Sequence, residues 1–206
     1  MLFQLLFPKG RFSTARFIAR FFVVVLSVSL VIGGVTCNVS YGAALEGVTL
    51  PDSVSANETT LVLNGLGIRR ATIFKVRVYV MGLYLEKKSH EEAAILKSTQ
   101  SKRIVMHFVR DVSVSKLRGA WQEGFEKNYT AFDTIAREIE QFQASMTDMK
   151  KGEQMVLDFV ADHVDVEVRG VKKTSIQGRP FQEALLSIWL GPHPPDDKLK
   201  QGILGR

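Results

Sequence analysis

One arginine of this chain follows a short glycine-rich segment, and its side chain could do specific chemistry. Residues 65–69 read Gly-Leu-Gly-Ile-Arg, and Tyr79 follows ten residues after Arg69. A guanidinium is a planar, permanently charged fork that suits a carboxylate or an enolate oxygen. A tyrosine hydroxyl nearby can complete the same anion site. Arg69 and Tyr79 are therefore the candidate ligand-binding residues. The alternative is that Arg69 pairs with a carboxylate of the protein and Tyr79 lies half buried on a sheet.

Other common catalytic patterns are not found in the sequence. The glycine segment lacks the third glycine and the following helix of a dinucleotide loop, and no serine or threonine occupies a nucleophile elbow. The four histidines fall on different predicted elements, and no cluster has metal-ligand spacing. The sequence thus predicts no catalytic residue, no metal and no cofactor.

The candidate residues sit on two predicted strands. Residues 59–64 have strand composition, and the glycines at 65 and 67 predict a turn that delivers Arg69 to the start of the next element. From Lys75 to Val80 the pattern alternates, which predicts the three valines on one face and Lys75, Arg77 and Tyr79 on the other. The alternation stops at Gly82, which indicates a bulge or a close backbone approach there.

The rest of the chain alternates between strand and helix patterns. Helical spacing of apolar residues predicts buried stripes at 117–125, 132–142 and 181–188, and these are assigned to the core. A shorter helix is expected at 90–97, and a short strand near the start of the segment 45–58. Further strands are expected at 102–110, 154–160, 164–169 and 171–176, the last two joined as a hairpin across Gly170. This order predicts an α+β fold, with an antiparallel sheet covered by helices on one face.

The N-terminal segment resembles a secretory signal. It carries four basic residues before an apolar run at 21–35, then small residues up to Ala44, and the first acidic residue is Glu46. This pattern predicts a signal peptide at residues 1–44, cleavage after Ala44 and a single domain at 45–206, in the periplasm or secreted. An uncleaved anchor is the alternative, and it would be the only membrane contact. The one cysteine, Cys37, lies in this segment, so the mature domain would carry no disulfide.

Removal of this segment changes the charge of the protein. The full chain has a formal net charge of +6, but four of its 27 basic residues precede the predicted cleavage, leaving 23 against 21 acidic residues, or +2. The remaining basic clusters are short and separated by acidic residues. Because nucleic-acid binding needs a basic patch on the folded domain, nucleic acid is not expected as a partner.

Two motifs and the C-terminal helix together resemble the chalcone isomerase-like family, in particular its bacterial secreted branch. They are the Gly-Leu-Gly-Ile-Arg segment at 65–69, Gly-Leu-Tyr-Leu-Glu at 82–86 and Ile-Trp-Leu-Gly-Pro at 188–192. The resemblance implies an open-faced β-sandwich. In the enzymes of the family the corresponding arginine stabilises negative charge during ring closure of a chalcone, and in the fatty-acid-binding relatives it grips the lipid carboxylate.

The chain departs from the enzymes of that family. The interval between Arg69 and Gly82 is two residues shorter, and Tyr79 stands where the enzymes carry a substrate-positioning threonine. Of the tyrosine and asparagine that the enzymes carry on the following helix, only Gln122 lies near the position of the amide. The arginine is thus retained while most of the remaining active site is not.

These observations leave three functions open. The leading one is a binding domain for a small amphipathic carboxylate such as a fatty acid, because one arginine and an apolar cleft suffice for it and each buried CH₂ adds about 0.8 kcal/mol. The second is an isomerase, an intramolecular lyase acting on a chalcone-like enone. It needs orienting groups, which can contribute roughly 7–11 kcal/mol and which this sequence does not supply. The third is a ligand-free envelope protein with an unknown protein partner.

Overall fold

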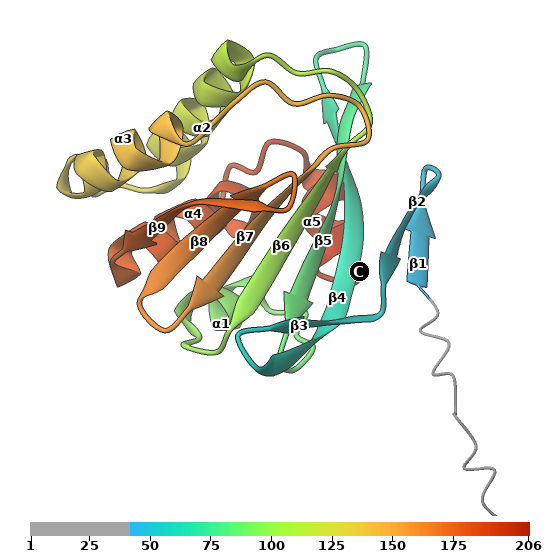
Figure 1. The fold of residues 1–206 in the computed structure, drawn as a ribbon, viewed down its shortest axis with the longest axis horizontal. Coiled ribbons are helices and arrows are strands. Elements are labelled where there is room, and N and C mark those ends of the chain that lie inside the picture. The colour runs from blue at the N-terminus through green and yellow to red at the C-terminus, as the bar shows by residue number, and fades with distance from the viewer. Residues whose placement is uncertain (1–41) are drawn as a thin grey trace, which may run out of the picture. The chain divides into compact units, whose positions relative to one another are not determined.

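An antiparallel seven-stranded sheet forms the body of the protein. The computed structural model describes residues 42–206, and Figure 1 shows helices packed on one face of the curled sheet. The strands are neighbours in chain order, from β3 to β9, and β1 and β2 form a separate two-stranded sheet. The elements are β1 Gly42–Leu45, β2 Val48–Pro51, β3 Ser53–Ala56, β4 Thr59–Ala71, β5 Val76–Leu85, α1 Glu92–Lys97, β6 Lys102–Phe108, α2 Val114–Asn128, the 3₁₀ turn η1 Phe132–Ile135, α3 Ala136–Ala144, β7 Gln154–Val160, β8 His163–Val168, β9 Val171–Gln177, α4 Arg179–Leu190 and α5 Asp197–Ile203.

The two faces of the sheet carry separate hydrophobic clusters. The larger cluster fills the space between the sheet and the helices, and it includes Trp121, Phe142 and Trp189. The smaller cluster lies on the other face, where Val48 and Leu50 of the β1–β2 hairpin pack with strand residues. The predicted α+β class, with helices on one face of an antiparallel sheet, is therefore confirmed.

The predicted helical stripes correspond to observed helices. The stripe at 117–125 lies in α2, where Leu117, Trp121 and Phe125 are buried. The stripe at 132–142 spans η1 and α3, and the stripe at 181–188 lies in α4. Arg169 and Gly170 have positive φ angles of 54° and 73°, and they form the turn of the predicted β8–β9 hairpin. Helical and strand periodicity thus located most of the elements.

The predicted glycine turn before Arg69 is wrong. Gly65 and Gly67 lie inside β4, a continuous strand of 13 residues. Their role is close packing, because a Cβ at Gly65 would lie 2.2 Å from the Gly202 carbonyl oxygen and one at Gly67 would lie 2.6 Å from the Leu199 oxygen. Helix α5, which the sequence did not predict, crosses the strand at this contact. The glycines are therefore needed so that a helix backbone can approach a strand backbone.

Asn64 fixes the strand at the same place. The β4–β5 register shifts between Leu63 and Gly65, which leaves Asn64 as an extra residue in the ladder. Its side-chain amide donates to the carbonyl oxygens of Ser89 and Ile203, at 2.9 Å each, and its oxygen accepts from the Ser89 N–H at 2.8 Å. At Gly82, where the sequence indicated a bulge or a close approach, the register is regular, and the close approach is what is found: a Cβ there would lie 2.7 Å from Leu50 Cδ1.

The described segment has a complete core. Residues 42–206 hold the whole sheet, the helices that cover it and both clusters, so we expect this segment to fold on its own. Residues 42–44, which the sequence assigned to the end of the signal, belong to β1 and pair with β2. The signal-peptide prediction otherwise falls on residues 1–41, outside the described range. Among the described residues, no helix has the length and apolar character to cross a membrane.

Candidate ligand-binding cavity

A cavity of about 590 Å³ opens between the sheet and helix α2. Its floor consists of buried side chains, and its rim consists of exposed charged ones. The walls come from β4, β5, β6, α2, the end of α4 and the proline-rich loop that follows α4. The floor residues are Tyr79, Met106, Leu117, Trp121, Ile188 and Trp189. The volume lies within the range of roughly 300–1,000 Å³ that is typical of small-molecule sites.

A β-bulge shapes the sheet wall of this cavity. Arg69 pairs with Tyr79, but Arg70 pairs with Arg77, so Val78 is an extra residue in β5. The extra residue breaks the alternation of side chains. As a result, both Val78 and Tyr79 line the cavity. The prediction that Tyr79 shares a face with Arg77 and lies opposite Val78 was therefore wrong, because a regular alternation cannot reveal a bulge.

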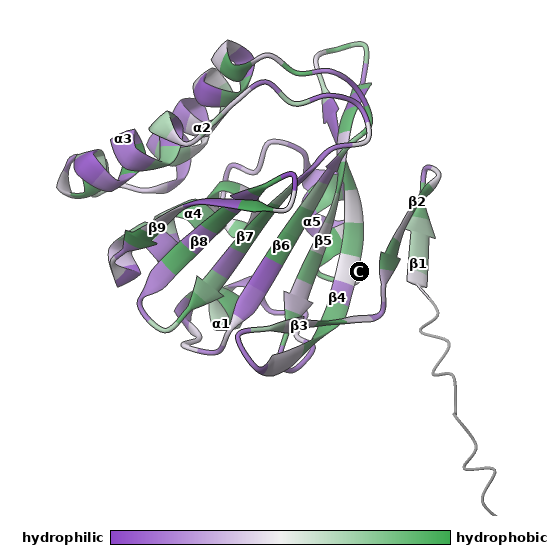
Figure 2. Cartoon of the chain, in the orientation of Figure 1, coloured by the Kyte–Doolittle hydropathy of each residue, from purple (hydrophilic) through white to green (hydrophobic). Residues whose placement is uncertain are grey.

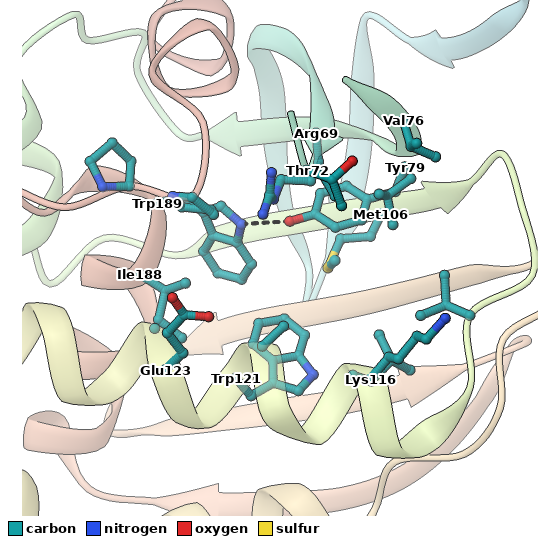
Figure 3. A pocket seen from close by; sticks show the side chains of 18 of the residues that line it. Arg69, Thr72, Val76, Tyr79, Met106, Lys116, Trp121, Glu123, Ile188 and Trp189 are labelled. Carbon is teal, nitrogen blue, oxygen red and sulfur yellow. Dashed lines mark hydrogen bonds between the residues drawn. The ribbon is translucent and has the colours of Figure 1, made fainter. Parts of the chain in front are cut away.

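The structure brings Arg69 and Tyr79 together on this wall. They are directly opposite each other on adjacent strands, and both line the cavity. Figure 3 shows the Arg69 guanidinium next to the Tyr79 hydroxyl, facing the space between sheet and helix. One Arg69 nitrogen donates a hydrogen bond to the carbonyl oxygen of Arg70. In the described structure Arg69 forms no ion pair, so its charge is available within the cavity.

Trp189 orients the Tyr79 hydroxyl. The indole Nε1–H of Trp189 donates to the Tyr79 oxygen at 3.1 Å, drawn as a dashed line in Figure 3. Burial raises the pKa of Tyr79 above its usual value, an effect that the Trp189 hydrogen bond and the Arg69 charge oppose. Tyr79 therefore keeps its proton at neutral pH. No other described group accepts that proton, so the hydroxyl can donate to a ligand oxygen.

Trp121 supplies a further polar atom that the sequence analysis missed. It lies on the α2 wall, packs edge-on against Trp189 with ring centroids 5.4 Å apart, and is 4% exposed. Its Nε1–H is buried without a hydrogen-bond partner, the one such side-chain atom found among the described residues. Figure 3 shows this nitrogen turned toward Lys116. The helical spacing of Trp121 predicted a core residue. Its indole N–H could have indicated a binding role as well, because this group needs an acceptor when it is buried.

The rim of the cavity carries more positive than negative charge. We define the cavity mouth as the exposed polar lining residues Thr72, Arg110, Asp111, Lys116, Glu123, Lys127 and His193. The Lys127 amine lies 2.5 Å from a Glu123 oxygen, and this hydrogen bond holds the pKa of Glu123 below its usual range. Asp111 pairs with Lys150 outside the mouth at 3.2 Å. Arg110 and Lys116 form no ion pair with the described residues, so the mouth attracts anions.

Gln122, which the resemblance placed near the family's amide, does not line this cavity. Its side chain donates to Glu126 at 2.8 Å and accepts from Gln143 at 2.7 Å, on the side of α2 that faces α3. The residues of α2 that do face the cavity are Lys116, Leu117, Ala120, Trp121, Glu123, Gly124 and Lys127. Within residues 42–206, no group of His, Cys, Asp and Glu side chains is arranged to hold a metal ion.

The comparisons with known proteins point to one family. The model of the chalcone isomerase-like family matches residues 42–205. Among solved structures, a fatty-acid binding protein from Arabidopsis thaliana has the same fold, with a TM-score of 0.66 and 14% sequence identity. The aligned region covers 79% of this chain and 95% of that chain. No curated protein sequence matches the chain. At this identity, the structural likeness shows a shared fold.

Proposed function

Because the chain belongs to the chalcone isomerase-like family, we propose that it binds a small amphipathic carboxylate, such as a fatty acid, in the cavity between sheet and helices. One observation carries the proposal: Arg69 and the Tyr79 hydroxyl lie side by side on the wall of a mostly apolar cavity. In this proposal Arg69 pairs with the carboxylate, and Tyr79 donates a hydrogen bond to it. The N-terminal sequence favours export, so we propose that binding takes place in the periplasm or outside the cell.

The apolar floor supports an acyl tail. Met106, Leu117 and Ile188 line the cavity together with Trp121 and Trp189. Each CH₂ group that enters such a site gains about 0.8 kcal/mol. The charged head then contributes through charge-assisted hydrogen bonds, which are worth about 1.5–3 kcal/mol each. The fatty-acid binding protein of the same fold supports this choice of ligand.

Binding is favoured over catalysis because the groups that orient the substrate in the enzymes of the family have no equivalent in this cavity. Tyr79 stands at the position of their threonine, and Gln122 is hydrogen-bonded to Gln143 on the side of α2 that faces α3. We therefore propose ligand binding in place of the isomerase activity that the sequence left open.

The proposal is tested by comparing a carboxylate with its neutral analogue. Isothermal titration calorimetry with dodecanoate and with methyl dodecanoate would be carried out on the segment 42–206 and on its Arg69→Met variant. We expect the variant to bind dodecanoate about tenfold to a hundredfold more weakly, because it loses a charge-assisted contact. We expect the affinity for the ester to change little.

A matched variant controls for the loss of one positive charge. Arg118 is exposed on α2 and donates to the Gln143 carbonyl oxygen at 3.0 Å, away from the cavity lining. Arg118→Met should bind dodecanoate as the parent protein does. Equal losses for acid and ester in Arg69→Met would contradict the assigned carboxylate contact, and dodecanoate affinity that is unchanged in this variant would overturn the proposal.

A further inference from the structure

The turn between β4 and β5 exposes two large apolar side chains. Ile73 is 88% exposed and Phe74 is 81% exposed, while the only other large hydrophobic residue exposed in the described chain is Val171, at 54%. Figure 2 shows hydrophobic colour at the end of this turn, which projects beyond the β4–β5 strands. An adjacent apolar pair at a convex tip is costly to leave in water, and such exposure marks an interaction site.

The turn holds these side chains outward. The Lys75 N–H donates to the Thr72 carbonyl oxygen at 3.1 Å, and the Phe74 N–H donates to the Thr72 hydroxyl at 3.3 Å. Thr72 and Lys75 have positive φ angles of 62° and 49°, which are uncommon for residues with a side chain. The tip is therefore a defined turn that presents Ile73 and Phe74 together.

Positive charge surrounds this tip. Residues 69–77 read Arg-Arg-Ala-Thr-Ile-Phe-Lys-Val-Arg, with four cations and no acidic residue. Within the described residues, Glu46 is the one carboxylate that forms ion pairs with this segment, at 3.3 Å from Arg70 and 2.6 Å from Arg77, while Asp196 accepts a hydrogen bond from the Arg70 backbone N–H at 2.9 Å. Lys75 has no ion pair within residues 42–206. The tip thus combines exposed apolar side chains with a surplus of basic groups.

We propose that the β4–β5 tip inserts Ile73 and Phe74 into the interface of a lipid bilayer with anionic headgroups. Two side chains on a convex turn are far smaller than the roughly 800 Å² that each partner contributes to a stable protein interface. A fluid bilayer can close around such a tip, and anionic lipids attract the neighbouring basic residues. This membrane contact would be additional to the one expected of the N-terminal segment if that segment is uncleaved.

The tip lies next to the cavity, so a membrane contact there would bear on ligand exchange. Ala71, Thr72 and Val76, at the base of the turn, line the cavity described above. Arg110 and Lys116, at the cavity mouth, carry the same sign of charge as the tip. A bilayer bound at Ile73 and Phe74 would therefore lie next to the cavity mouth, where an amphipathic ligand could leave or enter the lipid.

The experiment measures vesicle binding without any fatty acid, so its outcome is independent of the ligand assay. The segment 42–206 would be sedimented with vesicles of phosphatidylcholine alone and with vesicles of equal phosphatidylcholine and phosphatidylglycerol. We expect binding to the anionic vesicles that salt weakens. The Ile73→Ser/Phe74→Ser variant should bind at least about tenfold more weakly, because the apolar anchor is gone. Lys75→Ala should bind about fivefold more weakly.

Two further variants keep the test decisive. Val171→Ser removes an exposed apolar residue elsewhere on the molecule, and it should bind as the parent does. Phe74→Trp preserves the apolar tip and adds a fluorophore there, whose emission should be quenched by brominated lipid. The proposal is overturned if the parent segment fails to bind anionic vesicles, if the double serine variant binds as well as the parent, or if brominated lipid leaves the added emission of Phe74→Trp unquenched. Light scattering that finds dimers in the parent and monomers in the serine variant would instead assign the tip to a contact between copies of the chain.

Discussion

The two ends of the β4–β5 strand pair differ in how closely they are packed. At one end, Gly65 and Gly67 let α5 approach the strand until backbone atoms touch. At the other end lie the bulge at Val78, the cavity of about 590 Å³ and the turn 72–75 with its exposed tip. We call these the closed end and the open end. Arg69 lies at the boundary between them, so the close packing fixes the position of the side chain that faces the cavity.

Buried polar groups follow the same division. At the closed end, the Lys102 amine donates to the carbonyl oxygens of Ser98 and Gln100 at 2.7 and 2.9 Å, and Asn64 bonds to three backbone groups. At the open end, the Trp121 Nε1–H has no partner among the described residues. A buried donor without an acceptor costs about 1–3 kcal/mol. The closed end thus satisfies its buried polar groups, whereas the open end leaves this donor without an acceptor among the described residues.

The largest predicted effect removes the close approach at the closed end. In Gly65→Ala the new Cβ would meet three backbone atoms, at 2.2, 2.8 and 2.9 Å, and neither element can yield without breaking its hydrogen bonds. We expect the free energy of unfolding, measured by urea denaturation, to fall by about 3 kcal/mol.

Gly119→Ala is the control for this substitution. Gly119 lies in α2 with no atom within 4 Å of an added Cβ, so alanine should raise the free energy of unfolding by about 0.5–1 kcal/mol. If Gly65→Ala were as stable as the parent, the contact between α5 and β4 would be wrong, and the closed end would not differ from the open one.

The second prediction concerns pH and the buried lysine. Burial lowers the pKa of Lys102 to about 8 from its ordinary value of 10.5. Between these values the unfolded chain binds more protons than the folded one, so the free energy of unfolding should rise with pH, by about 1–2 kcal/mol between about pH 7.5 and 9.5. The measurement does not extend to higher pH, because burial raises the pKa values of Tyr79 and Tyr84 in the folded protein. Ionisation of these tyrosines in the unfolded chain would lower the free energy of unfolding and oppose the trend.

Lys102→Met should abolish this rise in urea denaturation at the two pH values. Lys88→Met, at an exposed position after β5, should keep it. A rise of the same size in Lys102→Met would assign the pH dependence to other groups and would remove Lys102 from the account of the closed end.

The smallest predicted effect sharpens the description of the open end. Tyr79→Phe removes the hydroxyl that accepts from Trp189 and, in our proposal, donates to the ligand. We expect dodecanoate affinity, measured by calorimetry, to fall about fivefold to tenfold, less than in Arg69→Met, because a neutral donor is worth about 1 kcal/mol. Tyr129→Phe, which changes a tyrosine outside the cavity lining, should leave affinity unchanged. Unchanged affinity in Tyr79→Phe would exclude the hydroxyl from the site.

The periodicity of apolar residues predicted most of the fold, because an element that packs on one face must repeat its apolar residues at the helical or strand period. Apolar residues recur at a regular interval in α2, α3 and α4 and in strands β6 to β9, and a short stretch of sequence is enough to show that interval. Helix α5 was missed because it is short, follows a proline-rich loop and has only Leu199 and Ile203 buried. The glycines of β4 predict a turn from local sequence alone, because the reason for them, the backbone of α5, lies about 130 residues away along the chain.

The candidate site was predictable only in part. Arg69 and Tyr79 were named from residue chemistry and family resemblance, and they do lie together on one wall. The bulge that turns Val78 and Tyr79 to the same side has no signature in an alternating pattern. The spacing of Trp121 predicts a core residue, and Trp189 enters the sequence argument only within the motif at 188–192. Their indole N–H groups matter through partners that the sequence does not identify.

The contact between Gly65 and Gly202 also bears on when this protein can fold. The two residues are far apart in the chain, and the adjoining residues Ile203 and Leu204 are fully buried. Contacts between distant residues form late, because a long loop must close before any contact rewards it. Until residues 197–204 have left the ribosome and, in our proposal, the export channel, α5 cannot cross β4. The strand that carries Arg69 is therefore packed against this helix only late in folding, although Arg69 itself belongs to the first half of the domain.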